Sequence, residues 1–512
     1  MPSIGRREGA PASTLRCVTT SVRSSGVAAP VRPGRARRRR HVRVPAGIAA
    51  GHPVTSEVGL RTLAAGGTAA DAAVAAVLAC CVAESVLTGI GGGGFATYYD
   101  ARTRAVTCLD FFCSVPGLDG DAAAGPMVPI DVNFGGVPLR YAIGGASVAV
   151  PGVPAGCGEL HRRWGRLPWH RLVEPAVMLA RSGVVMPVAQ ARTLASVAPA
   201  LVPNDGAQIY SPGGRLLEGG DLLFHPGLDR ALTLLAEQGP AVFYTGRIGA
   251  QIVETVRAAG GSLGPADLAA YRVRELPVTQ ATFAGHRVYG REDLNGTVRT
   301  IDALPARLRA LRPGPRAVAM ARALLAHGRE RIGDTTNISV VDADGNACVV
   351  TLTLGIGSGV WLPGLGVHLN SMLGEGELWA GERAPGQRVG SMMCPLVVLD
   401  QAGDLVLAAG SAGASRIRTA LVHTLVNVLV DGLHPAAAAA RPRFHVVAGE
   451  PEAPATVHVE PGYPEGELAA LAEAGYAINR WDHTSHYFGG VSMVGRDGAA
   501  GDPRRGGVGL LA

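Results

Sequence analysis

Lysine is absent from this chain of 512 residues, and all 47 of its basic residues are arginine. We interpret this as codon bias in a GC-rich genome rather than as a functional signal. Residues 1–43 hold eleven arginines against one acid, Glu8, so they carry about +10 and the remainder about −4 of the net charge of +6. The run at residues 37–40 could touch nucleic acid, but no basic stripe with interleaved aromatic residues follows it. We therefore expect no nucleic-acid partner.

Cysteine pairs with CxxC spacing are also missing. The eight cysteines are scattered without CxxC spacing, which argues against both a disulfide framework and a structural zinc site. We expect them to be small buried residues in a reducing compartment. His483 and His486 are three residues apart, but no cluster of acids or cysteines accompanies them. The sequence therefore predicts neither a metal nor a cofactor.

The chain lacks a long hydrophobic run. Residues 1–45 are rich in arginine and contain no apolar core of the length that a secretory signal needs. The longest apolar helix candidate, residues 72–82, is too short to span a bilayer. We expect a cytoplasmic protein without a membrane partner, whose segment 1–45 is an arginine-rich disordered tail or the product of a misplaced start codon. With 47% hydrophobic and 17% charged residues over its full length, the chain has the composition of a folded soluble protein.

Two segments rich in β-branched residues, 335–342 and 346–354, are joined by an Asp-Gly turn. This pattern is typical of a β-hairpin. Two hydroxyl residues, Thr335 and Thr336, stand at the start of its first strand. Threonine is a poor nucleophile unless a base adjoins it, and the free amine of a chain that begins with threonine can be that base. The placement suggests a protein that cuts itself before Thr335, although strand propensity alone also explains two threonines there.

The glycine-rich run at residues 89–94 contains the pattern GxGxxG. A dinucleotide-binding loop needs a strand before the glycines and a helix after them, whereas here a predicted helix precedes them and a predicted strand follows. We therefore expect no dinucleotide site. Thr68 and Asp71 form a capping-box pattern at the start of that helix, and residues 121–147 are expected to be rich in loops. Helices, then strands, then helices follow along the chain, which favours a layered sandwich with sheets inside.

The order of motifs from about Gly47 to Arg504 resembles that of the γ-glutamyltransferase (γ-glutamyl transpeptidase, glutathione hydrolase) family of N-terminal-nucleophile hydrolases. The motifs that carry the resemblance are His52-Pro53, Gly66-Gly67, residues 71–73, 89–95 and 149–152, Asp334-Thr335-Thr336 with 339–342 and 344–346, and residues 410–413, 441–444 and 502–504. Because so many collinear motifs agree, the chain is identified as a divergent member of that family.

The resemblance implies an α+β fold with four layers, an αββα sandwich. It also implies self-cleavage between Asp334 and Thr335. The products would be a large-subunit portion, residues 46–334 behind the tail, and a small-subunit portion, residues 335–512. These two portions would stay associated as one domain.

The resemblance also implies roles for four residues in catalysis. Thr335 attacks the substrate amide with its own amine as base, and the hydroxyl of Thr353 orients this nucleophile. The backbone N–H groups of Gly413 and Ala414 hold the oxyanion. The family has glycine at both of these last positions. Since alanine keeps its N–H, we expect the departure at Ala414 to be mild if the backbone angle permits a Cβ.

The residues expected to bind the acyl group depart further from the family pattern. Phe112 stands where γ-glutamyl-binding members have an arginine that clamps the substrate α-carboxylate, and phenylalanine cannot donate to a carboxylate. Ser391 with Met392 replaces a serine pair that binds the same carboxylate. Glu375 replaces an aspartate that holds the α-amino group, and Gly355 replaces an asparagine. These changes keep the residues expected to carry the reaction but remove contacts expected to bind a γ-glutamyl group.

Three functions remain open. The first is a γ-glutamyltransferase-like hydrolase that cleaves γ-glutamyl amides such as glutathione and passes the acyl group to water or an acceptor amine. The second is a relative acting on another acyl amide, such as an acylase for a dicarboxylic side chain, with Phe112 and Met392 lining a more apolar pocket. The third is an unprocessed, catalytically silent binding homologue. Arg388, near the serine motif in sequence, is a candidate to replace the missing clamp.

Overall fold

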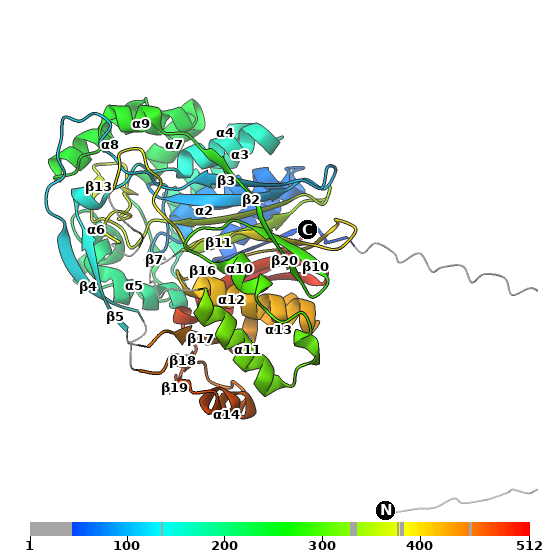
Figure 1. Ribbon diagram of the computed structural model, residues 1–512. Coiled ribbons are helices and arrows are strands. Elements are labelled where there is room, and N and C mark those ends of the chain that lie inside the picture. The colour runs from blue at the N-terminus through cyan, green and yellow to red at the C-terminus, as the bar shows by residue number, and fades with distance from the viewer. Residues whose placement is uncertain (1–42, 135–136, 328–334, 376–377, 379–382, 450–452) are drawn as a thin grey trace, which may run out of the picture. The chain divides into compact units, whose positions relative to one another are not determined.

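The computed structural model describes residues 43–134, 137–327, 335–375, 378, 383–449 and 453–512. Most of the predicted tail, residues 1–42, and Asp334 at the predicted cleavage point lie outside the described residues. Two β-sheets stack at the centre, and helices cover the outer face of each (Figure 1). The predicted α+β fold, a four-layer αββα sandwich, is confirmed.

The first sheet has seven strands in the order β22-β1-β11-β12-β2-β3-β8. Its strands are β1 (Gly47–Ala50), β2 (Gly93–Tyr99), β3 (Val106–Phe111), β8 (Arg274–Leu276), β11 (Thr336–Val341), β12 (Ala347–Thr353) and β22 (Val508–Leu511). The predicted hairpin is therefore confirmed as β11 and β12. Both strands lie inside the sheet and every residue of each is buried, which explains why the hydrophobic runs are nearly continuous.

The second sheet has six strands in the order β21-β20-β16-β15-β10-β9. Its strands are β9 (Thr279–Phe283), β10 (His286–Gly290), β15 (Leu396–Leu399), β16 (Leu405–Ala412), β20 (Gly490–Gly495) and β21 (Gly498–Gly501). An apolar layer between the sheets includes Ala49 and Val349 from the first and Ala408 and Val494 from the second. Polar bonds also cross it: Ser339 Oγ donates to the Ser492 carbonyl at 2.8 Å.

Helices form the two outer layers. Those sharing a core with the seven-stranded sheet are α1 (Pro53–Ala64), α2 (Ala69–Ala83), α3 (Val153–Trp164), α4 (Trp169–Ser182), α7 (Leu228–Gln238), α8 (Arg247–Ala258) and α9 (Pro265–Ala270). Those sharing a core with the six-stranded sheet are α10 (Thr297–Asp302), α11 (Pro313–Ala326), α12 (Arg416–Leu425), α13 (Pro435–Ala440) and α14 (Glu465–Glu473). Within the described residues, no helix is long and apolar enough to cross a bilayer.

Helix α2 explains how the glycine run is placed. All of its residues are buried, as expected for a helix that is apolar on every face. The predicted capping box is present, with Thr68 and Asp71 each bonding the other's backbone N–H. The helix ends at Ala83, and β2 begins at Gly93. The order of helix, glycines and strand is therefore confirmed, and it is the reverse of a dinucleotide-binding loop.

The prediction that residues 121–147 are rich in loops was wrong for residues 128–134 and 137–143. Strands β4 (Val128–Phe134) and β5 (Val137–Ile143) form an antiparallel two-stranded sheet there. Prolines 129 and 138 obscure the strand signal because proline is usually excluded from sheet interiors. A two-stranded sheet has only edge strands, so both prolines are accommodated.

The remaining α-helices and β-strands are α5 (Val188–Leu201), α6 (Gly206–Tyr210), β6 (Val184–Val185), β7 (Leu222–Leu223), β13 (Trp361–Leu362), β14 (Val367–His368), β17 (Phe444–Val447), β18 (Thr456–Val459) and β19 (Ala477–Arg480).

Candidate active site

One end of the central hairpin holds the two threonines predicted to carry the reaction. Thr336 pairs with Leu352 in the antiparallel register of β11 and β12, so the next residue outward, Thr335, lies level with Thr353. Both threonines are buried, at 4% and 6% exposure. Oγ1 of Thr353 accepts a hydrogen bond from the Gly355 N–H at 2.9 Å. This bond fixes the direction of the Thr353 hydroxyl beside the predicted nucleophile.

The same row extends across the next two strands. Thr353 pairs with Gly93 of β2, and a Cβ added to Gly93 would lie 3.0 Å from the Cα of Phe112. Thr335, Thr353, Gly93 and Phe112 therefore end four neighbouring strands at one level. Because strands lie about 4.8 Å apart, Phe112 is about 14 Å from Thr335 along the sheet. That spacing suits contact with the far end of an acyl chain rather than with the reacting carbonyl.

The second sheet contributes the loop that follows β16. Arg505 connects this loop to the hairpin: its Nη1 donates to the Thr335 carbonyl at 3.3 Å, and its Nη2 lies 3.5 Å from a Cβ built on Gly413. The carbonyls of Gly413 and Ala414 accept bonds from the first turn of α12. The loop thus brings the two predicted oxyanion residues to the guanidinium that also holds Thr335.

Ala414 does not have the backbone angle that would make its side chain harmless. Its φ is +51°, and that of Gly413 is +112°. Both are left-handed conformations, which cost an L-residue about 1–2 kcal/mol relative to glycine. The departure from glycine at Ala414 therefore introduces strain, and the expectation that it is mild does not hold. The strain is confined to the backbone, because alanine retains the N–H.

A buried carboxylate adjoins the start of β11. Glu84, the residue that caps the end of α2, accepts hydrogen bonds from the Thr336 hydroxyl and, at 2.8 Å, from the Thr55 hydroxyl. Glu84 has 0% exposure. Its hydrogen bond engages the hydroxyl of Thr336, the second threonine of the pair. Thr335 therefore stays the predicted nucleophile. Nothing in the sequence had marked Glu84 as a site residue.

Glu375 occupies space that a side chain at position 355 would fill. Gly355 has φ of +72°, and a Cβ added to it would lie 2.6 Å from both Glu375 Oε1 and Ser371 Oγ. The two departures from the family pattern are thus coupled: the longer acidic side chain fits because the neighbouring residue has none. Since the Gly355 N–H also bonds Thr353, the Glu375 carboxylate lies close to the predicted reaction centre.

Phe112 and Met392 belong to one apolar cluster, together with Phe95 and Met372. Phe112 is 1% exposed, and its ring lies 5.4 Å from that of Phe95. Ser391 is held by its backbone: its N–H donates to Asp293 Oδ2 at 2.8 Å. Phe112 and Met392 thus belong to the same core, and Ser391 is fixed to Asp293.

Arg291 is the arginine that the fold places beside these residues. Its guanidinium lies 3.8 Å from the centre of the Phe95 ring. It donates to the carbonyls of Ser391 and Met393 at 3.3 and 2.8 Å and to Asp293 at 2.8 Å. Nothing in its sequence context had marked it as a site residue. Its donors are directed at the chain around Ser391, so it shapes this loop.

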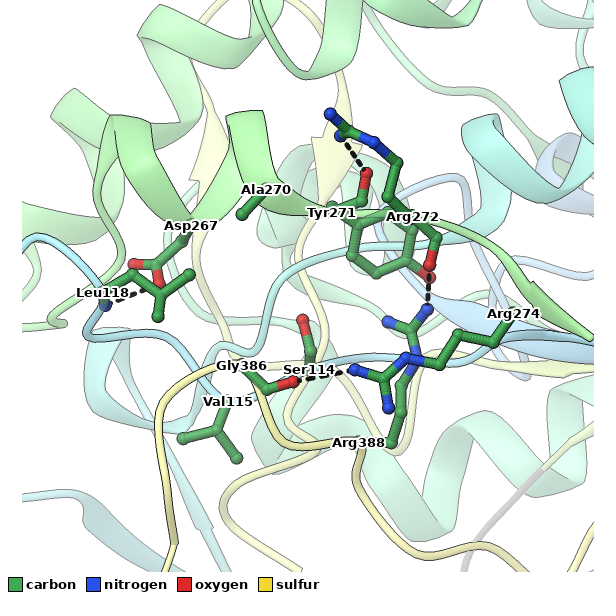
Figure 2. A pocket seen from close by; sticks show the side chains of 10 residues that line it. All are labelled: Ser114, Val115, Leu118, Asp267, Ala270, Tyr271, Arg272, Arg274, Gly386 and Arg388. Carbon is green, nitrogen blue, oxygen red and sulfur yellow. Dashed lines mark hydrogen bonds between the residues drawn. The ribbon is translucent and has the colours of Figure 1, made fainter.

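Arg388, the suggested substitute for the missing clamp, is engaged elsewhere (Figure 2). Its Nε lies 3.3 Å from Asp110 Oδ2, it donates to the Arg272 carbonyl, and it stacks 4.4 Å from the centre of the Tyr271 ring. It lines a cavity of about 260 Å³ with Ser114, Val115, Leu118, Asp267, Ala270, Tyr271, Arg272, Arg274 and Gly386. None of the predicted substrate residues borders that cavity, so the structure gives no support to Arg388 as the clamp.

Cysteine and metal chemistry find no support near this site. Cys113 directly follows Phe112 and is buried, and burial raises the pKa of its thiol well above the ordinary value. Burial likewise raises the pKa of Cys394, to about 12. A thiol that stays protonated is a weak nucleophile. Among the described residues, no group of three or more histidine, cysteine, aspartate or glutamate side chains is arranged to hold a metal ion.

Comparison with known proteins decides the family. The family described as Gamma-glutamyltranspeptidase matches residues 55–306 and 309–512 of this chain. The chain belongs to this family. It is a divergent member: Glutathione hydrolase 3 of Arabidopsis thaliana is 28% identical over 470 residues, covering 78% of this chain and 72% of that protein. Membership of the family makes the protein an N-terminal-nucleophile hydrolase or acyltransferase.

Not all relatives are named as glutathione hydrolases. The Acylase ACY 1 proenzyme of Pseudomonas sp. (strain SE83) is also 28% identical, over 497 residues that cover 85% of this chain and 87% of that protein. Cephalosporin acylase from Bacillus halodurans has the same fold, with a TM-score of 0.74 over 94% of this chain and 98% of its own, at 22% identity. Overall similarity therefore leaves the acyl group open within the family.

Proposed function

We propose that this protein cuts its own chain before Thr335 and then hydrolyses, or transfers the acyl group of, a γ-glutamyl-type amide. The observation that carries the proposal is the juxtaposition at one end of the two sheets. Thr335 is buried level with Thr353, and Arg505 connects it to the Gly413-Ala414 loop. A hydroxyl, a partner hydroxyl and a loop suited to an oxyanion are the components that acyl transfer requires.

The proposed reaction has two halves. Oγ of Thr335 attacks the amide carbonyl while its own amine takes the hydroxyl proton, and the N–H groups of Gly413 and Ala414 hold the developing oxyanion. The C–N bond then breaks, the amine product takes that proton, and the acyl group remains as an ester on Thr335. Water or an acceptor amine attacks the ester in the second half and restores the threonine hydroxyl. No cofactor or metal takes part in these steps.

Glu375 supports a donor with a free amino group. Its carboxylate is buried beside Gly355 and close to Thr353, where it can accept a charge-assisted hydrogen bond from an ammonium group. A γ-glutamyl amide such as glutathione carries an ammonium group on its acyl portion. This feature favours γ-glutamyl amides as the first candidate class of donor.

Phe112 and Met392 support the second candidate class, acyl amides without the amino acid end. Both lie in the apolar cluster, and neither can bind a carboxylate as an arginine or a serine would. The resemblance to an enzyme named as an acylase equals that to an enzyme named as a glutathione hydrolase. A glutaryl amide, which matches the γ-glutamyl amide but lacks its amino group, separates the two classes.

Glu375→Gln separates these donor classes in one measurement. For a γ-glutamyl donor we expect KM to rise about 10–100-fold, because a hydrogen bond to a charged group contributes about 1.5–3 kcal/mol. Turnover of the matching glutaryl amide should not change. The measurement is release of a chromophoric amine from the two amides, with Glu375→Asp as the control that keeps the charge.

A wild-type enzyme that prefers the glutaryl amide and is indifferent to Glu375→Gln would establish the acylase alternative. If the purified chain remains uncut after prolonged incubation, as shown by its intact mass, and releases no amine from either compound, it is a silent homologue. That result would remove both enzymatic proposals.

A further inference from the structure

Arg505 stands at the junction of the nucleophile and the oxyanion loop. One nitrogen of its guanidinium donates to the Thr335 carbonyl at 3.3 Å, and the other lies 3.5 Å from a Cβ built on Gly413. The residue is 6% exposed. Because a carbonyl oxygen and the amine of the same residue are separated by only about 3 Å, the guanidinium lies within roughly 7 Å of the Thr335 nitrogen.

The fold makes specific room for this side chain. Gly490, the first residue of β20, has no side chain, and a Cβ there would lie 2.2 Å from Arg505 Cδ. Arg505 directly follows Arg504, which is fixed in a buried ion-pair network with Asp502 and Glu460. The backbone of Arg505 is thereby anchored while its guanidinium reaches the hairpin. These contacts describe a built position rather than a solvated surface arginine.

We propose that Arg505 is a positioning residue that aligns Thr335 with the Gly413-Ala414 loop and whose positive charge keeps the Thr335 amine neutral after cleavage. The inference rests on the proposed function. A neutral amine is required because an ammonium group cannot accept the hydroxyl proton. A nearby cation disfavours the ammonium form and lowers the pH at which the amine becomes a base.

The other charges around Thr335 act in the opposite direction or lie far away. Among the elements packed on β11, strands β1, β12, β16 and β20 carry no acidic or basic side chain. Helix α2 carries Asp71 near its start, beyond the turn end of the hairpin, and is capped by Glu84, which bonds Thr336. Glu84 favours the ammonium form. Arg505, at the Thr335 carbonyl, acts against this influence.

The neighbouring segments add three further groups. The Glu375 carboxylate lies beside Gly355, whose N–H bonds Thr353, and like Glu84 it favours the ammonium form. Arg416 of α12 donates to the Tyr487 carbonyl at 3.1 Å and stacks on the Tyr487 ring. His486 belongs to the turn before β20. Arg505 donates directly to the Thr335 carbonyl at 3.3 Å. Arg505 is therefore the group whose removal tests the proposal.

The test compares the pH dependence of kcat/KM for amine release by the full-length wild type, Arg505→Gln and Arg505→Lys. The acid limb of the wild type should lie below the ordinary α-amino pKa of about 7.7–8.0. In Arg505→Gln we expect it to move upward by about one pH unit. Arg505→Lys, which keeps the charge but not the two-armed geometry, should retain the wild-type limb and lose about tenfold in kcat.

Arg418→Gln is the matched control. Arg418 is 5% exposed and also donates to backbone carbonyls, those of Asn295 and His327. Its loss should lower the melting temperature without moving the acid limb.

An unchanged acid limb of the pH profile in Arg505→Gln overturns the inference. If Arg505→Gln stays uncut, Arg505→Lys is the deciding variant. An acid limb displaced from that of the wild type, or a kcat equal to that of the wild type, in Arg505→Lys contradicts the proposal. A wild type that neither cuts itself nor turns over either amide removes the proposed function and the inference with it.

Discussion

Thr335→Ala is expected to leave a single uncut chain of 512 residues and to lower amide turnover by at least about 10³-fold. Alanine removes the hydroxyl that we propose to open the peptide bond before it and later to carry the acyl group. Intact mass would show one species in place of fragments of 334 and 178 residues, which together make up the 512. Release of a chromophoric amine measures the second effect.

Thr336→Ala is the natural control because it removes the neighbouring hydroxyl from the same strand. Thr336 donates to the buried Glu84, so its loss should reduce stability by about 1–3 kcal/mol, the cost of leaving a buried acceptor without its partner, while cleavage before Thr335 persists. Thr335→Ser keeps a hydroxyl and should still cut. If Thr336→Ala abolished cleavage and Thr335→Ala did not, the assignment of the nucleophile would be reversed.

Asp502→Asn is expected to be the most destabilising single substitution that we propose, at about 3–5 kcal/mol. The Asp502 carboxylate pairs with Arg443 at 2.6 Å and with Arg504 at 3.1 Å, and it accepts the Val491 N–H at 3.0 Å. The three side chains are at most 2% exposed. Removing the anion leaves two buried guanidinium groups with less compensation. The shift in the thermal unfolding midpoint measures the loss.

The same network has a defined pH dependence. Burial by itself would raise the pKa of Asp502, but the guanidinium groups of Arg443 and Arg504 outweigh it and hold the pKa below the ordinary value. A carboxyl with a lowered folded-state pKa adds stability that is fully present above its unfolded value of about 3.9 and is lost as the pH falls through the folded value. Between pH 4 and 2 the wild type should therefore lose more stability than Asp502→Asn.

A surface pair provides the contrast for Asp502. Arg480 and Glu465 also make two short bonds, both at 2.6 Å, but their side chains are 56% and 74% exposed. Solvent screening makes such pairs nearly neutral, so Glu465→Gln should leave the unfolding midpoint unchanged. Equal losses from both substitutions would show that burial is not what gives the Asp502 network its strength.

The local sequence determined the parts of the fold whose signals are local. The Asp-Gly turn between β-branched runs identified the hairpin of β11 and β12, and the pattern from Thr68 to Asp71 identified the start of α2. Collinear motifs identified the family and, through it, the four layers. The prediction of strands failed where the strand itself contains a proline, as in β4 and β5.

The chemical candidates were likewise readable one at a time. Thr335, Thr353, Phe112 and Glu375 could each be named from its motif. Their relation could not, because it depends on the register between strands. That register brings Thr335 level with Thr353 and extends the row to Phe112. The part of this register that reaches Phe112 was fixed only when the sheet formed, since β2 and β3 lie far from the hairpin in the chain.

The tertiary structure alone decided which partners support the predicted nucleophile. Glu84 meets Thr336 across 252 residues of chain, and Arg505 meets Thr335 across 170. It also showed that Glu375 fits against Gly355 and that Arg388 is occupied by Asp110. The sequence by itself determined the residue types and the hairpin. Which charges and backbone groups surround Thr335 depends on side chains from distant segments, and only the packing of the two sheets brings those segments together.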